Sequence, residues 1–233
     1  MVPEEARSVG VSAHTALEPR RAPVTGVILA GGEASRYGGR PKGLEQVAGR
    51  RILDRVADAL TTAADDLLLI ANDPDAEAWL PGVRTATDVR PGLGSLGGIH
   101  SALVRAGRPV LLVAWDMPFV PASLLALLRD RGRDADVAVP ESGSRRGVEP
   151  LCAYYAPACV APIEQRLAAD DLRVVGFFDD VRVTRIDADE VARHGDPVRS
   201  FMNVNSPEDL ELAESYAQQH AASPDGVHRR QEE

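Results

Sequence analysis

The segment from Gly26 to Gly43, GVILAGGEASRYGGRPKG, constrains the fold of this chain more than any other stretch. Its apolar run, Val27 to Ala30, has the composition of a buried strand and stops abruptly at two adjacent glycines. The loop that follows carries further glycines and the cations Arg36 and Lys42. Glycines leave room for bare N–H groups to face phosphate oxygens, and cations neutralise the remaining charge. The segment therefore predicts a strand that ends in a phosphate-binding loop, although the adjacent glycines alone would suit an ordinary strand-to-helix turn.

Two common phosphate-binding loops are excluded by their spacing. The dinucleotide fingerprint requires GxGxxG after the first strand, and no such spacing occurs in this segment. The P-loop requires GxxxxGK followed by Ser or Thr, whereas Lys42 lies between Pro41 and Gly43. The order LAGG, SRYGG, RPKG instead resembles the signature loop of the nucleotidyltransferase superfamily, which joins a nucleoside triphosphate to a phosphorylated acceptor. The resemblance implies that the LAGG backbone and the lysine hold the nucleotide.

The composition is that of one ordinary globular domain. The chain has 233 residues, of which 44% are hydrophobic and 26% charged, so it can bury a full core. A net charge of -9 argues against a general nucleic-acid binder, and no apolar stretch approaches the length of a membrane span. The start, MVPEEARSVG, lacks the apolar core of a secretory signal, and the two cysteines suit buried reduced thiols. We therefore expect a cytoplasmic protein.

Apolar runs and amphipathic patterns alternate along the chain. We expect flexible tails over residues 1–22 and 218–233 and a single domain over residues 23–217. Continuous apolar strands between amphipathic helices indicate a mostly parallel sheet covered on both faces, a three-layer α/β/α sandwich of Rossmann-like type. The predicted strands are 24–29, 67–71, 110–114, 136–140 and 152–155, and the predicted helices are 50–62, 97–105 and 122–131.

Polar residues follow the predicted strands where ligands of such sheets bind. Asn72 follows one apolar run, Asp88 follows 85–87, and Asp116 follows Trp115 at the end of another. Because ligands lie outside the carboxyl ends of parallel strands, we expect these side chains to converge with the glycine loop at one edge. Packing alone would not place polar residues after each strand.

Asp116 is the predicted metal ligand. A carboxylate at the end of a buried strand either caps a helix or binds a metal. A triphosphate site needs a divalent cation, and Mg²⁺ takes only one or two protein carboxylates, with water and phosphate oxygens completing its shell. We therefore favour Mg²⁺ binding by Asp116 over capping.

The glycine-rich segment 91–99 and the residue before it form a second candidate site. The segment PGLGSLGGI runs into a predicted helix, whose N-terminal N–H groups attract anions or base carbonyls, unless it is only a long turn. Asp88 could accept hydrogen bonds from a guanine or a ribose hydroxyl, or it could be a surface turn residue.

Two segments are candidates for binding the acceptor. Asn203 and Asn205 alternate along a predicted short final strand, so both would face one side, unless they only stabilise the turn before a helix that starts at Ser206. Arg146 follows another arginine in a Gly- and Ser-rich loop, which suits either a second phosphate site or a solvated loop tip.

Five motifs together resemble the molybdenum cofactor guanylyltransferase family. They are LAGG…SRYGGRPKG, PGLGSLGG, WDMPF, EPLCAYY and MNVNSPEDL, in the order of the family, across about residues 24–215. The resemblance implies transfer of GMP from GTP to molybdopterin or its molybdenum adduct, with release of pyrophosphate and a requirement for Mg²⁺. It also implies molybdenum insertion proteins and apo-molybdoenzymes as partners, while nucleic acid and membrane are not expected.

The resemblance also implies roles for individual residues. The catalytic residues are Lys42 and Arg36 at the triphosphate and Asp116 at the metal, and the acceptor is expected at Asn203, Asn205 and Arg146. The expected nucleotide-binding residues are Leu29, Ala30, Gly31, Gly32, Lys42, Asn72, Asp88 and Asp116.

Two departures from the family pattern leave the substrate open. Pro41 stands where the family commonly has Asp, and Trp115 stands where it usually has a smaller residue such as Cys. The alternatives are a cytidylyltransferase on the same cofactor, another sugar- or alcohol-phosphate nucleotidyltransferase, or a non-catalytic adaptor that binds nucleotide and delivers cofactor.

Overall fold

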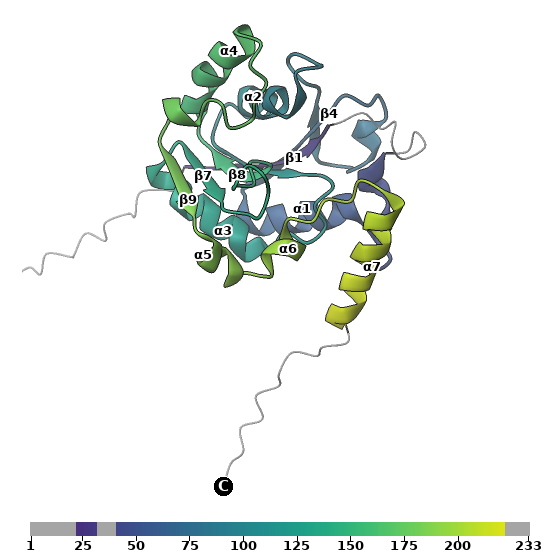
Figure 1. Cartoon of the computed structure of the whole chain (residues 1–233). Helices are drawn as coiled ribbons and strands as arrows, with labels where there is room; N and C mark the ends of the chain where they lie inside the picture. The colour runs from purple at the N-terminus through teal and green to yellow at the C-terminus, as the bar shows by residue number, and fades with distance from the viewer. Residues whose placement is uncertain (1–21, 32–40, 222–233) are drawn as a thin grey trace, which may run out of the picture.

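The computed structural model describes residues 22–31 and 41–221 of the chain (Figure 1). The predicted tails lie largely outside these ranges, as do Gly32 and Arg36. The described residues form a seven-stranded sheet between two layers of helices, which confirms the predicted three-layer α/β/α sandwich (Figure 1).

The sheet of the described residues has seven strands in the order β5-β4-β1-β6-β8-β7-β9. Strand β1 pairs in parallel with β4 and β6, so the predicted phosphate loop leaves from the middle of the sheet. Strand β8 runs antiparallel to both β6 and β7, and the remaining pairs are parallel. The strands are β1 (Thr25–Ala30), β4 (Asp66–Ala71), β5 (Arg84–Ala86), β6 (Val110–Ala114), β7 (Val137–Pro140), β8 (Cys152–Tyr155) and β9 (Val183–Ile186).

Helices cover both faces of the sheet (Figure 1). The long helices α1 (Ile52–Ala63) and α3 (Ala122–Arg131) lie together on one face, and α2 (Gly94–Ala106) and α4 (Val160–Ala168) lie on the other. Each face buries its own apolar cluster, built from alternate residues of the strands, as expected for a sheet covered on both sides.

Shorter elements complete the described fold. Helix α7 extends from the face that carries α1 (Figure 1) and packs near the small hairpin β2–β3 through a third apolar cluster. The remaining elements are β2 (Gln46–Val47), β3 (Arg50–Arg51), α5 (Ala188–Ala192), α6 (Pro197–Ser200), α7 (Pro207–Ala221) and 3-10 turns at Lys42–Leu44, Ala76–Ala78, Gly132–Asp134, Pro157–Cys159 and Phe178–Asp180.

Most predicted strands and helices are found within one or two residues of their predicted bounds, and the larger differences have structural reasons. Helix α1 begins at Ile52 because Arg50–Arg51 pairs in the hairpin, and α2 begins at Gly94, before the predicted residue 97. No strand forms around Asn203 and Asn205, so that part of the prediction is wrong. Helix α7 continues through Ala221, past the predicted end of the domain at residue 217.

The cysteines match their predicted character. Cys152 and Cys159 are both buried and free of any disulfide. Burial raises the pKa of the Cys159 thiol to about 12 and that of Cys152 further, so both stay protonated at neutral pH. They are packing residues rather than nucleophiles.

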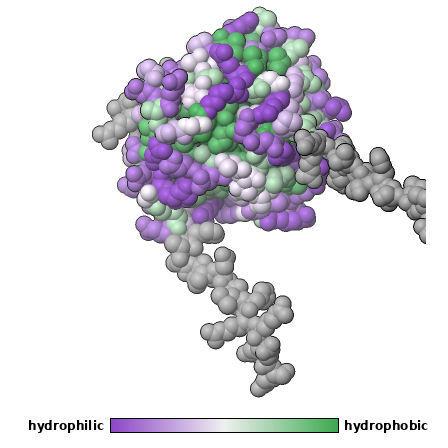
Figure 2. Space-filling view, turned by 180° about the vertical axis from the view of Figure 1, so that it is seen from behind, coloured by the Kyte–Doolittle hydropathy of each residue, from purple (hydrophilic) through white to green (hydrophobic). Residues whose placement is uncertain are grey.

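The surface carries isolated apolar side chains among polar ones. The face opposite that of Figure 1 shows hydrophilic and hydrophobic residues interspersed (Figure 2). Singly exposed apolar side chains are normal on folded proteins. Among the described residues, no helix combines the length and apolar character needed to cross a bilayer.

Candidate active site

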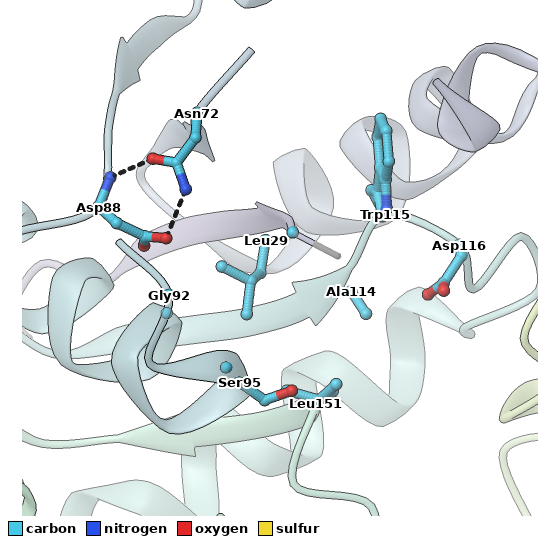
Figure 3. A pocket seen from close by; sticks show the side chains of 12 residues that line it. Leu29, Asn72, Asp88, Gly92, Ser95, Ala114, Trp115, Asp116 and Leu151 are labelled. Carbon is cyan, nitrogen blue, oxygen red and sulfur yellow. Dashed lines mark hydrogen bonds between the residues drawn. The ribbon is translucent and has the colours of Figure 1, made fainter. Parts of the chain in front are cut away.

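A cavity of about 520 Å³ opens where the central strands end (Figure 3). It is lined by residues that follow β1, β4, β5 and β6, together with the first turn of α2. Five residues named from the sequence lie in its wall, and they are Leu29, Gly31, Asn72, Asp88 and Asp116. The strand ends therefore converge on one hollow, as the alternation of strands and polar residues predicts.

Lys42 and Asp116 meet directly at the edge of this cavity. The Lys42 Nζ donates hydrogen bonds to Asp116 Oδ2 and to Asn205 Oδ1, each at 2.6 Å. The side chains of Lys42 and Asp116 are 20% and 10% exposed, so this ion pair is largely shielded from water. Lys42 is also the only lysine among the 26 lysines and arginines of the chain. The structure thus joins three segments that are far apart in sequence around one ammonium group.

Asp116 is held by its backbone and keeps one carboxylate oxygen available. Its carbonyl accepts the Val204 N–H at 2.9 Å, which ties the segment before α7 to the site. Its Oδ1 is buried and has no hydrogen-bond partner within the described residues. Leaving a buried carboxylate oxygen unpaired costs about 1–3 kcal/mol, so a ligand is expected to supply the missing partner.

A divalent cation fits this free oxygen. Within residues 22–31 and 41–221, no group of three or more His, Cys, Asp or Glu residues is placed to hold a metal. A cation at Asp116 would therefore have few protein ligands and take its other ligands from water and phosphate oxygens. That is the ligand set typical of Mg²⁺ in phosphate-binding enzymes.

Asn72 and Asp88 form a reciprocal pair at the other end of the cavity (Figure 3). The Asn72 Nδ2 donates to Asp88 Oδ2 at 2.7 Å, and the Asp88 N–H donates to Asn72 Oδ1 at 2.9 Å. These bonds fix the carboxylate, while its Oδ1 is buried without a partner among the described residues. An oriented acceptor of this kind can read the donor edge of a nucleotide base or a ribose hydroxyl.

The start of α2 forms the floor between these two ends. No side chain caps the helix, so its first N–H groups remain for a ligand. Gly98 lies against β1, and a Cβ there would come within 2.7 Å of Leu29 Cδ1. A larger residue at position 98 would require the Leu29 side chain to move, so glycine favours this close approach, which brings the helix N-terminus into the wall of the cavity.

The predicted acceptor residues are not all brought to the site. Asn205 reaches Lys42, but Asn203 donates to the Phe201 carbonyl at 3.0 Å and serves its own turn. The prediction that both face one side fails because the segment is irregular rather than extended. Arg146 is exposed in a turn outside the cavity wall, and Ala30 is buried in β1.

Several residues of the site lie in motifs that the sequence singles out, but the sequence assigned no binding role to these individual residues. Ser95 and Leu151 line the cavity, and Trp115 does so with its ring stacked on Trp79. Glu149 is half-buried, and burial is the main cause that raises its pKa above the ordinary 4.5, with Asp116 adding to the effect. Glu149 begins the motif EPLCAYY, but the sequence does not show that its carboxyl becomes half-buried.

Replacing Glu149 by glutamine is expected to raise the free energy of unfolding at pH 7–8. Because the folded pKa lies above the unfolded one, the ionised carboxylate weakens the fold as pH rises through that window. The advantage of Glu149→Gln should vanish below about pH 4, where the carboxyl is protonated in both states. Thermal unfolding from pH 4 to 8 measures it, with exposed Glu77→Gln as the control. A gain that does not change with pH would show that burial of the charge is not the cause.

Comparison with known proteins identifies the family. The family model described as "MobA-like NTP transferase domain" matches residues 26–181. A molybdenum cofactor guanylyltransferase of Desulfosudis oleivorans is 36% identical over 195 residues, which cover 82% of this chain and 95% of that protein.

Solved structures show the same fold. The molybdopterin-guanine dinucleotide biosynthesis protein A from Archaeoglobus fulgidus superposes with a TM-score of 0.71 at 24% identity, covering 84% of this chain and all of that one. A Mycobacterium tuberculosis protein solved in complex with manganese superposes with a TM-score of 0.57 at 21% identity, covering 83% of this chain and 98% of that one. Nucleotidyltransferases are in general metal-dependent. The family match over most of the chain and the curated relatives show that this chain is a nucleotidyltransferase and belongs to the molybdenum cofactor guanylyltransferase family.

Proposed function

We propose that this enzyme transfers GMP from GTP to molybdopterin or its molybdenum adduct and releases pyrophosphate, with Mg²⁺ as the metal. The observation that carries the proposal is the pairing of Lys42 with Asp116 at a cavity where one Asp116 oxygen has no partner among the described residues. The substrates follow from the names of the relatives, which are guanylyltransferases of the molybdenum cofactor. The cavity has the size expected of a site for a small ligand.

The reaction requires positioning and charge neutralisation. A phosphate oxygen of the acceptor forms a bond to the α-phosphorus of GTP, and the bond from that phosphorus to the pyrophosphate breaks in line. The leaving pyrophosphate takes the electron pair, and no covalent protein intermediate is needed. Mg²⁺, when bound at Asp116, would neutralise the charge that develops on the phosphate oxygens.

Different residues of the chain are proposed to bind the phosphates, the base and the acceptor. Lys42 places a positive charge beside the phosphates, and the first turn of α2 offers N–H groups to anionic or carbonyl oxygens. Asp88 is proposed to accept hydrogen bonds from the guanine, because Asn72 orients it toward the cavity (Figure 3). The proposal keeps Arg36 and Gly32 at the triphosphate, and Asn203, Asn205 and Arg146 with the acceptor.

A nucleotide panel tests the choice of base. GTP with Mg²⁺ is expected to raise the melting temperature more than CTP, ATP or UTP, because a ligand that binds only the folded state stabilises it. At about 100 times its dissociation constant, a ligand contributes about 2.7 kcal/mol. A larger shift with CTP would favour the cytidylyltransferase alternative. Pyrophosphate release from GTP in the presence of molybdopterin then excludes a non-catalytic adaptor.

Asp88→Asn is expected to reduce the preference for GTP over ATP by about 10- to 100-fold, the value of a hydrogen bond to a charged group. Guanine presents its N1–H and 2-amino donors side by side to a carboxylate, whereas adenine has an acceptor at N1 and no 2-amino group. Competition binding with both nucleotides measures the ratio. Asp73→Asn is the matched control, because Asp73 is the sequence neighbour of Asn72, but its carboxylate accepts the Asp75 N–H and the residue does not line the cavity. An equal loss for all nucleotides would place Asp88 at the ribose instead.

A further inference from the structure

Two tryptophans form a rigid stack beside the site. The rings of Trp79 and Trp115 have centroids 5.4 Å apart and an interplanar angle of 17°. They are the only tryptophans of the chain, and they are 7% and 5% exposed. The turn that carries Lys42 rests on the same ring, since a Cβ on Gly43 would lie 2.4 Å from Trp115 Cε3. Contacts from both neighbours leave the Trp115 ring little room to turn.

This ring holds an unused hydrogen-bond donor. The Nε1 of Trp115 is buried and has no partner within the described part of the chain. Buried tryptophan N–H groups usually find an acceptor, and leaving one unpaired is unfavourable. Trp115 lines the cavity next to Asp116, whose Oδ1 likewise has no partner in residues 22–31 and 41–221. Figure 3 shows the ring on edge, with its nitrogen at the end nearer Asp116 in this view.

The charges and hydrogen-bonding groups at this end of the cavity indicate which kind of ligand would accept the Trp115 N–H. An indole N–H only donates, so its partner must be an acceptor oxygen or nitrogen. Lys42 contributes positive charge here, while the acceptor Asp88 lies at the opposite end. The ligand must accept hydrogen bonds from Trp115 and Lys42 and also bind a cation held by Asp116. An anionic phosphate meets both requirements.

We propose that the Trp115 indole N–H donates a hydrogen bond to a phosphate oxygen of a substrate bound between Lys42 and Asp116. The proposal rests on the proposed function, because it assumes that this cavity takes phosphorylated substrates. It adds a neutral, rigid donor at a position where the family that the sequence resembles usually has a smaller residue. The phosphate belongs either to the nucleotide or to the acceptor, and the binding data distinguish the two.

The test compares Trp115→Phe with Trp79→Phe. Each variant keeps an aromatic ring in the stack and removes one indole, but only the first removes the donor in the cavity wall. Calorimetry with GTP and Mg²⁺ gives nucleotide affinity, and steady-state kinetics give kcat and KM for the acceptor. Trp115→Phe is expected to weaken the binding of one of the two substrates by about tenfold or more. Trp79→Phe is expected to change the binding of either substrate by no more than about twofold.

The outcomes separate the possibilities. Weaker GTP binding assigns the bond to a nucleotide phosphate, and an unchanged GTP affinity with a higher acceptor KM assigns it to the acceptor phosphate. Equal effects of the two variants, or none, would overturn the proposal and leave Trp115 a packing residue. Wild-type protein that fails to bind GTP would instead contradict the proposed function itself.

A second replacement covers the case that Trp115→Phe does not fold. Benzothienylalanine, incorporated in place of tryptophan in a Trp79→Phe background, keeps the shape of the double ring but carries sulfur instead of N–H. The analogue should bind the same substrate about tenfold more weakly than the Trp79→Phe protein that carries a normal Trp115. Full affinity for both substrates with this analogue would overturn the proposal.

Discussion

Asp116→Ala is expected to lower the rate of GMP transfer by roughly 100-fold or more, the loss typical of removing a major charge stabiliser. The Asp116 Oδ1 is buried and unpaired among the described residues, and Oδ2 orients Lys42, so one substitution removes the candidate metal ligand and releases the ammonium group. Single-turnover kinetics with saturating GTP and acceptor isolate the chemical step. The fold should persist, because the backbone contact with Val204 does not involve the side chain.

Controls for Asp116 separate metal binding from general loss of charge. Asp130→Ala removes an exposed carboxylate that pairs only across the surface with Arg133, and it should leave the rate unchanged. Asp116→Asn keeps an oxygen for Lys42 but carries no charge, and it should be nearly as slow as the alanine variant. Near-normal turnover by Asp116→Ala would remove this residue from the mechanism.

Lys42→Met should also slow transfer by roughly 100-fold, because it keeps much of the apolar stem and removes the charge beside the phosphates. It leaves the largely shielded Asp116 carboxylate without its cation, so a lower melting temperature should accompany the slower rate. Lys42→Arg is not expected to restore the rate, since a planar fork cannot reproduce a compact ammonium that binds Asp116 and Asn205 together. Arg50→Met, which breaks an exposed pair with Asp58, is the matched control.

Lys42 can also be tested without mutation. Because it is the only lysine, reductive methylation modifies one ε-amino group, and peptide mass mapping follows it directly. GTP with Mg²⁺ is expected to protect Lys42 from methylation, since the nucleotide would lie against its ammonium. Equal labelling with and without nucleotide would contradict the assignment of Lys42 to the triphosphate.

A double variant tests whether Lys42 and Asp116 act together. Its loss of transfer rate should be smaller than the product of the losses of the two single variants, because each substitution disrupts the same pair.

Much of the fold could be predicted because it depends on local pattern. The runs that became β1, β4 and β6 are continuously apolar, and such runs between amphipathic helices fit only a covered sheet. The carboxyl ends of parallel strands in one sheet must share an edge, so Asn72, Asp88 and Asp116 could be brought together without coordinates.

Errors arose where tertiary contacts override local pattern. Asn203 and Asn205 alternate as in a strand, but neither neighbours a sheet edge, and each bonds to a different partner. Helix α2 begins before its predicted start because Gly94, with φ of 59°, can turn directly from loop to helix. The sequence showed glycines there but not which of them would begin the helix.

The amino-acid sequence by itself determined the layered α/β architecture, the family, and the chemical character of the phosphate loop, since these follow from periodicity and from motifs in fixed order. Only the tertiary structure decided that Lys42 meets Asp116 and Asn205 and that Asn72 orients Asp88. It also decided that the Trp115 N–H lies in the cavity wall with no partner in the part of the chain that the structure describes. The physical reason is that hydrogen bonds and burial depend on distances between segments far apart in the chain, and those distances are set by the packing of the whole sheet.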